Sequence, residues 1–220
     1  MAARQNRMDG QRDKQIIKSG GLYEILERFS QIERETKETK IKLLLCAESG
    51  SPGLEGSSGV GFFDHMLNTF AVHGGFGIKL EMTGDLFVDC HHSVEDAGIV
   101  LGTAFRKIIE QNKNIARFAS EYIPMDESLA FCAADLGGRA YLAFCADFKS
   151  PEINGYGTQM TKEFFYALAQ NMRSTIHINL LYGENDHHKT EAIFKAAART
   201  IKKALVLAGD TGIVSAKGTI

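Results

Sequence analysis

The sequence predicts an α+β domain that is built by internal duplication. One order of predicted elements carries this expectation: a helix with two adjacent phenylalanines, then a strand, then a helix that opens with two adjacent histidines. The order occurs twice, first over residues 62–112 and again over residues 164–209. Apolar residues recur at helical spacing in the predicted helices and form short runs in the predicted strands. A repeated set of elements indicates two copies of one supersecondary unit.

Composition narrows the class of protein. The chain has 220 residues and a net charge of −2, without a run of lysines or arginines. This charge argues against binding to nucleic acid or to a membrane surface. No apolar run is long enough to span a bilayer, and the N-terminus lacks the apolar core of a secretory signal. The four cysteines form no paired motif, so we expect reduced thiols in a cytoplasmic protein.

Residues 1–31 are expected to be an N-terminal extension outside the domain. Residues 1–15 are polar, and an apolar pattern between Ile16 and Phe29 predicts an amphipathic segment interrupted by Gly20 and Gly21. The domain itself is expected to cover residues 32–220. Its two pseudo-repeats would cover about residues 32–112 and 113–220.

The elements of the first half follow from local patterns. Alternation and an apolar run predict a strand at 33–46, and glycines and serines predict a hairpin or loop at 48–59. That loop lacks the Lys-Ser/Thr ending of a nucleotide phosphate loop. The remaining expected elements are a helix at 62–70 ended by His73-Gly74-Gly75, strands at 78–82 and 86–88, and a helix from His91 to about Asn112.

The second half repeats part of this order. The expected elements are strands at 129–134 and 141–148, a helix that opens with Phe164 and Phe165, a strand at 176–180, and a helix from His187 to about Gly209.

The two histidine doublets carry the functional prediction. Each has a glutamate four residues after its first histidine: Glu95 follows His91, and Glu191 follows His187. Residues four apart share one face of a helix, so each pair can hold one metal ion. The second histidines point about 100° away around the helix, so they would serve a second ion, the substrate or another subunit. A pair of polar helix starts at the surface is the alternative, but the repetition favours a paired metal site. Imidazole and carboxylate ligands suit manganese, iron or zinc.

Three rival functions share these features in part. A metal-dependent hydrolase or phosphatase would use a metal-bound hydroxide, and the same ligands permit it. A four-helix carboxylate metalloprotein uses a Glu-x-x-His order, whereas this chain has His-x-x-x-Glu and alternates strands with helices. An RNA-binding module disagrees with the net charge.

Five stretches resemble the imidazoleglycerol-phosphate dehydratase family. They are GFFDHML, VDCHHSVED, PMDESLA, HHKTEAIFKAAAR and the terminal SAKG, and residues 34–39 resemble the opening strand of the family. The resemblance runs in order from about Ile32 to Ile220. It departs at Thr69, Cys90 and Val214, where the family commonly has glutamine, aspartate and proline. No phosphatase segment is present, so the chain is similar to the monofunctional form.

The resemblance implies a fold and an assembly. Each half would have a four-stranded mixed sheet and two helices, with all four helices packed between the sheets. The protein would be a homo-oligomer of 24 subunits with active sites at subunit interfaces, acting on a small phosphate-bearing substrate. Two Mn²⁺ ions would bind at each active site.

The resemblance also implies roles for individual residues. The metal ligands would be His65, His91, His92, Glu95, His177, His187, His188 and Glu191. The catalytic carboxylates would be Glu38, Glu95 and Glu191, with Glu38 as the acid–base group. The substrate would be held by His73, Arg117, Arg139, Lys195, Ser215 and Lys217, mostly through its phosphate.

The implied reaction explains why two ions are needed. D-erythro-imidazole glycerol phosphate would lose water to give imidazole acetol phosphate, a step of L-histidine biosynthesis. The proton to be lost has no adjacent carbonyl to acidify it, so the imidazole ring itself must act as the electron relay. Metal ions on both ring nitrogens would hold the ring as imidazolate, which can expel the hydroxyl group. Two ions need two ligand sets, which a duplicated chain supplies.

Overall fold

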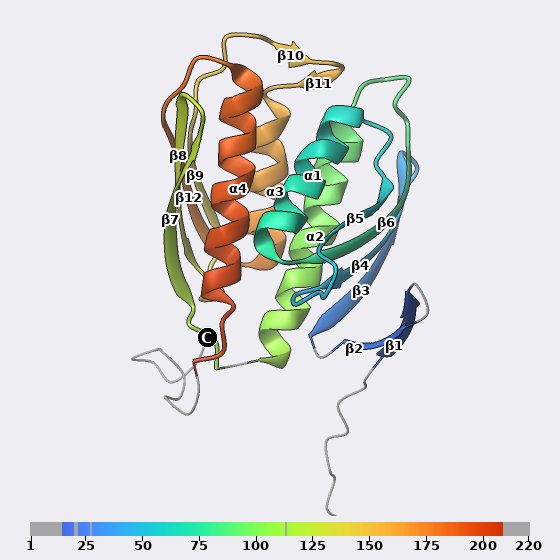
Figure 1. Ribbon diagram of the computed structural model, residues 1–220. Coiled ribbons are helices and arrows are strands. Elements are labelled where there is room, and N and C mark those ends of the chain that lie inside the picture. The colour runs from blue at the N-terminus through green and yellow to red at the C-terminus, as the bar shows by residue number, and fades with distance from the viewer. Residues whose placement is uncertain (1–14, 20–21, 27, 113, 209–220) are drawn as a thin grey trace, which may run out of the picture.

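Two four-stranded sheets enclose a layer of four helices (Figure 1). The computed structural model describes residues 15–19, 22–26, 28–112 and 114–208. The first sheet has the order β3-β4-β6-β5, made by β3 (Phe29–Glu35), β4 (Thr39–Cys46), β6 (Gly77–Gly84) and β5 (Gly53–Ser57). The second has the order β7-β8-β12-β9, made by β7 (Phe118–Met125), β8 (Ser128–Asp135), β12 (Thr175–Tyr182) and β9 (Tyr141–Cys145). The helices are α1 (Gly61–Gly74), α2 (His91–Gln111), α3 (Met160–Met172) and α4 (Asp186–Ala204).

The two halves have the same topology. Each runs through three strands, a helix, a strand and a helix, and each sheet is antiparallel except for one parallel pair. The parallel pairs are β5 with β6 and β9 with β12, which occupy equivalent places. The second half also carries a small hairpin of β10 (Glu152–Ile153) and β11 (Tyr156–Gly157). The predicted duplicated α+β fold is therefore confirmed.

The phenylalanine pairs that marked the repeat are not equivalent positions. Both α1 and α3 are followed by a residue with a left-handed backbone, Gly75 and Arg173, two residues before the next strand. Phe62 lies thirteen residues before Gly75, whereas Phe164 lies nine before Arg173. The pairs are thus about one helical turn apart, which keeps both on the buried face. With this register, His65 of α1 corresponds to Glu163 of α3.

Close packing in the helical layer sets the position of α2. A Cβ atom at Gly98 would lie 2.7 Å from the carbonyl oxygen of Phe164, and one at Gly102 would lie 2.5 Å from that of Leu168. Glycine at these two positions lets α2 approach the backbone of α3 closely. The aromatic rings of Phe164 and Phe194 stack in the same core, with centroids 5.3 Å apart. The close contact between α2 and α3 holds α2 in place, and with it the N-terminus of α2, which carries the first doublet.

Several predicted elements differ from those observed. The single strand expected at 33–46 is the β3–β4 hairpin, and its turn contains Glu38. The hydroxyl of Thr36 accepts the backbone N–H groups of Glu38 and Thr39, so this turn forms without glycine or proline. The expected loop at 48–59 contains β5, residues 86–88 form a turn rather than a strand, and β7 was not predicted.

The expected extension includes residues that belong to the folded body. β1 (Gln15–Ser19) and β2 (Leu22–Leu26) pair as an antiparallel hairpin, where an amphipathic segment was expected. β3 begins at Phe29, and the buried guanidinium of Arg28 donates to the carbonyl oxygen of Leu205 at 2.7 Å. Within the described ranges, every helix is too short or too polar to cross a membrane.

Candidate metal centre

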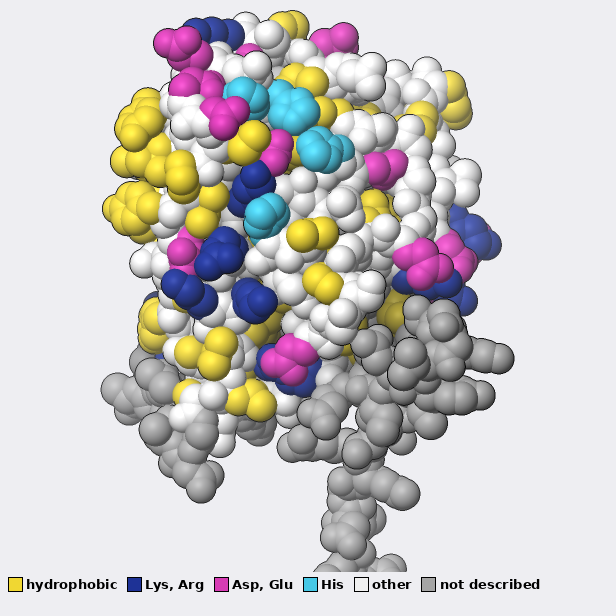
Figure 2. All heavy atoms as spheres, viewed as in Figure 1, with side chains coloured by type: hydrophobic (Ala, Val, Ile, Leu, Met, Phe, Trp, Pro, Cys, Tyr) yellow, Lys and Arg dark blue, Asp and Glu magenta, His cyan; other side chains and the backbone are white. Residues whose placement is uncertain are grey.

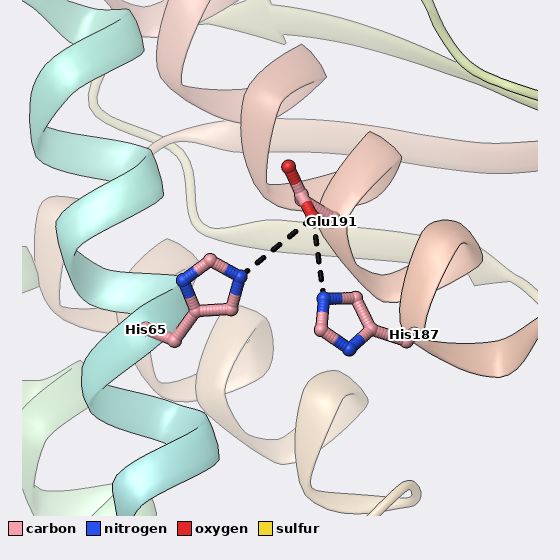
Figure 3. Close-up of side chains that lie close together, drawn as sticks. All are labelled: His65, His187 and Glu191. Atoms are coloured by element: carbon pink, nitrogen blue, oxygen red, sulfur yellow. Dashed lines mark ion pairs between the residues drawn. The ribbon is translucent and has the colours of Figure 1, made fainter.

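Two helices from opposite halves of the chain bring His65, His187 and Glu191 together (Figure 3). His65 comes from α1, and the other two come from α4. The Nε2 atom of His187 lies 3.3 Å from Oε2 of Glu191, and Nε2 of His65 lies 3.7 Å from the same oxygen. One potential ligand atom from each residue falls within 4.8 Å of the others. Two imidazoles and a carboxylate converging in this way fit a divalent transition metal.

The sequence around α4 explains why its histidines are available. The side chain of Asn185 caps the helix by accepting the backbone N–H groups of His187 and His188. The doublet therefore sits in the first turn, and the four-residue spacing places Glu191 above His187. The ring of Phe62 packs edge-on against His187, with centroids 5.1 Å apart. α1 is thereby seated so that His65 reaches the same place.

The first doublet forms only part of an equivalent centre. Nε2 of His91 lies 3.8 Å from Oε2 of Glu95, which matches the predicted pairing. Among the described residues, no third histidine, cysteine or carboxylate joins this pair at ligand distance. The position that corresponds to His65 is Glu163, so the duplication does not supply the missing imidazole. His91 faces a hollow of about 660 Å³, bounded by Cys90 and the β10–β11 hairpin.

The second histidine of each doublet faces a different set of carboxylates. Nδ1 of His92 lies 3.0 Å from Oδ2 of Asp85, and Nδ1 of His188 lies 2.8 Å from Oε2 of Glu127. These hydrogen bonds raise the pKa of both imidazoles, against the opposing effect of burial. The pKa of the Glu127 carboxyl is far below its usual range, because the Asn185 backbone N–H and the His188 ring both donate to it. Neither Asp85 nor Glu127 was singled out from the sequence, because neither lies on the helix of its histidine and helical spacing does not reveal the contact: Asp85 precedes His92 by 7 residues and Glu127 precedes His188 by 61.

A row of ionisable side chains follows one face of α4. His187, Glu191, Lys195 and Arg199 are spaced four residues apart, and Nζ of Lys195 lies 2.6 Å from Oε1 of Glu191. Burial by itself would raise the pKa of Glu191, but the hydrogen bond and charge of Lys195, together with His65 and His187, lower it overall. Figure 2 shows histidine side chains on this face with lysine and arginine side chains next to them. Arg199 was not among the predicted substrate residues, although its spacing from Lys195 could have revealed it.

His73 lies beside this row, at the C-terminal end of α1. Its pKa is lowered by burial and by the positive charges of Lys195 and Arg199. A neutral imidazole next to two cations can donate or accept a hydrogen bond at neutral pH. That His73 belongs to a substrate site stays a prediction.

Glu38 lies in the β3–β4 turn, so the expectation that it belongs to a strand is wrong. Its carboxylate Oε1 lies 3.8 Å from Nε2 of His92, and its side chain is 53% exposed. The carbonyl oxygen of Glu38 accepts the backbone N–H of Asp85 at 3.1 Å. Glu38, Asp85 and His92 are thus joined in one local group at the N-terminus of α2.

Three predicted site residues lie far from His65, His187 and Glu191 within one subunit. The backbone N–H of Arg117 donates to the carbonyl oxygen of Ala204, at the opposite end of α4 from His187. His187 and Ala204 are roughly 25 Å apart along this helix, at 1.5 Å per residue. The carbonyl oxygen of Arg139 accepts the hydroxyl of Thr175, where β12 begins, and His177 is exposed on the same strand. Ser215 and Lys217 lie outside the described residues.

Comparisons with known proteins identify the family. The family model of imidazoleglycerol-phosphate dehydratase matches residues 58–201. Relatives of that name from Bacillus cereus (strain ZK / E33L) and Caldicellulosiruptor bescii are 47% and 48% identical, over 89% and 88% of this chain and 100% and 99% of theirs.

Two solved structures agree with these relatives. The imidazoleglycerol-phosphate dehydratase of Staphylococcus aureus superposes with a TM-score of 0.74 at 36% identity, covering 81% of this chain and 99% of that one. That of Pyrococcus furiosus, in complex with (S)-C348, gives 0.74 at 33% identity, covering 86% and 100%. With both sequence and fold matched over nearly the whole length of these relatives, the chain belongs to the imidazoleglycerol-phosphate dehydratase family and is a hydro-lyase of histidine biosynthesis.

Proposed function

We propose that this enzyme dehydrates D-erythro-imidazole glycerol phosphate to imidazole acetol phosphate with two Mn²⁺ ions at each active site. The observation that carries the proposal is the convergence of His65, His187 and Glu191 in a member of this family. Bound Mn²⁺ would supply Lewis acidity that favours the anionic form of the substrate's imidazole ring, whose electrons can then expel the hydroxyl group on the attached carbon. The proposed ligands are those expected from the resemblance: His65, His91, His92, Glu95, His177, His187, His188 and Glu191.

Glu38 would be the acid–base group that transfers protons in the reaction. Its exposed carboxylate stands beside His92, at the edge of one proposed ligand set. A carboxylate there can take the C–H proton from the glycerol chain and return a proton to the carbon skeleton as the enol becomes the ketone. Glu95 and Glu191 would contribute negative charge next to the ions and help to orient the histidines that bind them.

The phosphate would bind along the row on α4. Lys195 and Arg199 provide positive charge one and two turns beyond Glu191, and His73 lies beside them. A phosphate placed there would leave the imidazole end of the substrate near His187. Guanidinium groups match phosphate oxygens with two parallel hydrogen bonds. Arg117, Arg139, Ser215 and Lys217 are proposed phosphate ligands from the resemblance.

A complete site would need more than one subunit. The His91–Glu95 pair is short of ligands, while His177, Arg117 and Arg139 lie at the far end of the second sheet. Exposed aromatic side chains cover the outer face of that sheet, including Tyr122, which is 60% exposed, and Tyr141. The outer face of the first sheet instead carries ion pairs such as Glu33–Lys42. An apolar outer face is typical of an interface, and it supports a homo-oligomer, with 24 subunits expected and active sites where copies meet. A cytoplasmic location also remains a prediction.

Turnover by metal-stripped protein tests the proposal. The purified protein is treated with a chelator, dialysed, and assayed with imidazole glycerol phosphate before and after Mn²⁺ is added. We expect the ketone product only after the addition, together with assembly beyond the single subunit in sedimentation measurements. Release of inorganic phosphate without ketone would instead support the hydrolase alternative and reject the proposed reaction.

A further inference from the structure

Both doublets share a contact that was not expected from the sequence. In each, a carboxylate from a neighbouring loop accepts a hydrogen bond at Nδ1 of the second histidine: Asp85 for His92 and Glu127 for His188. The first histidines differ, because they face a carboxylate of their own helix with Nε2. The side chains of the second histidines are therefore held by hydrogen bonds to carboxylates that lie outside their own helix.

The two carboxylates come from different places in the duplicated topology. Asp85 directly follows β6, and the residue in the same place after β12 is Gly183. Glu127 directly precedes β8, and the residue in the same place before β4 is Glu38. The same contact is thus made in both halves by residues that are not related by the duplication. Because unrelated residues make the same contact, the duplication did not simply copy it. This indicates that the second histidines need a carboxylate at Nδ1.

Asp85 and Glu127 each make a further hydrogen bond that restrains the residue. Glu127 accepts the backbone N–H groups of Glu184 and Asn185, at 3.1 and 2.8 Å. Asp85 is bound through its own backbone N–H to Glu38, and its side chain is 15% exposed. The carboxylate of Glu127 is therefore held by two backbone donors, whereas Asp85 is held through its backbone and by partial burial.

A carboxylate at Nδ1 decides which ring nitrogen can bind a metal ion. The carboxylate accepts a hydrogen bond, so the proton of a neutral imidazole stays on Nδ1 and the lone pair is on Nε2. In this structure Nε2 of His92 points toward Glu38, and Nε2 of His188 points toward Asp126, each at 3.8 Å. Both free nitrogens thus point toward exposed carboxylates rather than into the core.

We propose that Asp85 and Glu127 are positioning residues that hold His92 and His188 with the proton on Nδ1, leaving Nε2 to bind metal. The inference rests on the proposed function, because it takes these two histidines to be ligands. Asp85 would orient His92 and Glu127 would orient His188. Neither carboxylate would contact a metal ion or the substrate.

Manganese binding by matched variants tests this inference. The variants are Asp85→Ala and Glu127→Ala, with Asp85→Asn and Glu127→Gln as conservative changes whose amide oxygens still accept a hydrogen bond. Glu184→Gln is the control: it removes an exposed carboxylate three residues before His187, and the structure records no contact between that carboxylate and an imidazole in the described part of the chain. Free Mn²⁺ is followed by electron paramagnetic resonance as it is added to each metal-free protein.

The expected result is a selective loss of affinity. Each alanine variant should bind one class of Mn²⁺ about 10–100-fold more weakly, which is typical when the partner of a metal-binding histidine is removed. The amide variants should recover part of this loss, and Glu184→Gln should bind as the unchanged protein does. Unfolding of the metal-free proteins, measured in parallel, should show that the amide variants remain folded.

Two outcomes would overturn the inference. Equal Mn²⁺ affinity in both alanine variants and the unchanged protein would show that the carboxylates do not position ligands. Amide variants that lose as much affinity as the alanine variants would show that only the negative charge matters. Failure of the proposed function is a separate result: an unchanged protein that binds Mn²⁺ but makes no ketone would reject the reaction and leave this test valid.

Discussion

Nε2 of His65 and Oε2 of Glu191 lie 3.7 Å apart, although the two residues belong to opposite halves of the duplicated chain. His187 completes the group from the same helix as Glu191. The group exists because α1 packs against α4 in the helical layer, and Phe62 seats α1 against the first turn of α4. Among the described residues, it is the group of three side chains that lie close enough together to hold a metal ion.

His65→Ala and Glu191→Gln should each weaken Mn²⁺ binding. Either change removes one of three converging donors, so we expect at least a 100-fold loss in the affinity of one class of site. Calorimetric titration of metal-free protein would measure it. Glu163→Gln is the matched control, since Glu163 occupies the position in α3 that corresponds to His65. If His65→Ala bound Mn²⁺ as tightly as the unchanged protein, His65 would not be a ligand.

Glu38→Gln should lower turnover with little change in substrate affinity. The amide keeps the shape of the side chain but cannot accept a proton, and acid–base groups typically contribute about 10²–10⁴-fold. Steady-state kinetics with Mn²⁺ should show kcat reduced by that factor and KM within about threefold. Glu33→Gln, on the neighbouring strand, changes an exposed carboxylate paired with Lys42 and should leave kcat unaltered. Near-normal turnover by Glu38→Gln would refute the assigned role.

Gly102→Ala should destabilise the fold, although alanine favours helices. The added Cβ atom would lie 2.5 Å from the carbonyl oxygen of Leu168, so α2 and α3 would have to move apart. Overpacking costs about 1–3 kcal/mol, against a helix-propensity gain of about 1 kcal/mol. Urea unfolding of metal-free protein at fixed concentration should show a net loss. Gly61→Ala, where a Cβ atom would meet nothing within 4 Å, should be neutral or stabilising, and equal effects of the two changes would contradict this packing.

His73 should make the metal-free protein less stable as the solution becomes acidic. Burial, together with Lys195 and Arg199, lowers the pKa of His73 below its unfolded value of about 6.5. Between the folded and unfolded pKa values the unfolded chain binds more protons. The free energy of unfolding therefore falls as the pH drops from about 6.5 through the folded pKa, and it rises with pH over the same window.

Unfolding at about pH 5 and about pH 7.5 would measure this contribution. The decrease in stability between the two values should be smaller for His73→Gln than for the unchanged protein. His177→Gln, at an exposed position on β12, is the control for the loss of an imidazole. A larger decrease for His73→Gln would mean that the pKa of His73 is raised in the folded chain.

Local spacing accounted for a large part of the fold and of the candidate site. The duplicated order of elements, the two doublet helices and the pairing of each first histidine with its glutamate follow from helical periodicity, which acts over a few residues. The turn at Glu38 was missed because Thr36 forms it through its hydroxyl group rather than through glycine or proline. β5 was missed because a short strand rich in glycine and serine resembles a loop.

The sequence by itself therefore determined which residues are able to bind a metal and which of them share a helical face. Only the tertiary structure decided that His65 joins Glu191, that Asp85 and Glu127 grip the second histidines, and that Arg117 lies at the far end of α4. These relationships depend on the order of strands in each sheet and on which helices pack together. Most of them join segments far apart in the chain, and the Asp85–His92 contact joins a loop to the helix that follows it, so no local periodicity specifies them.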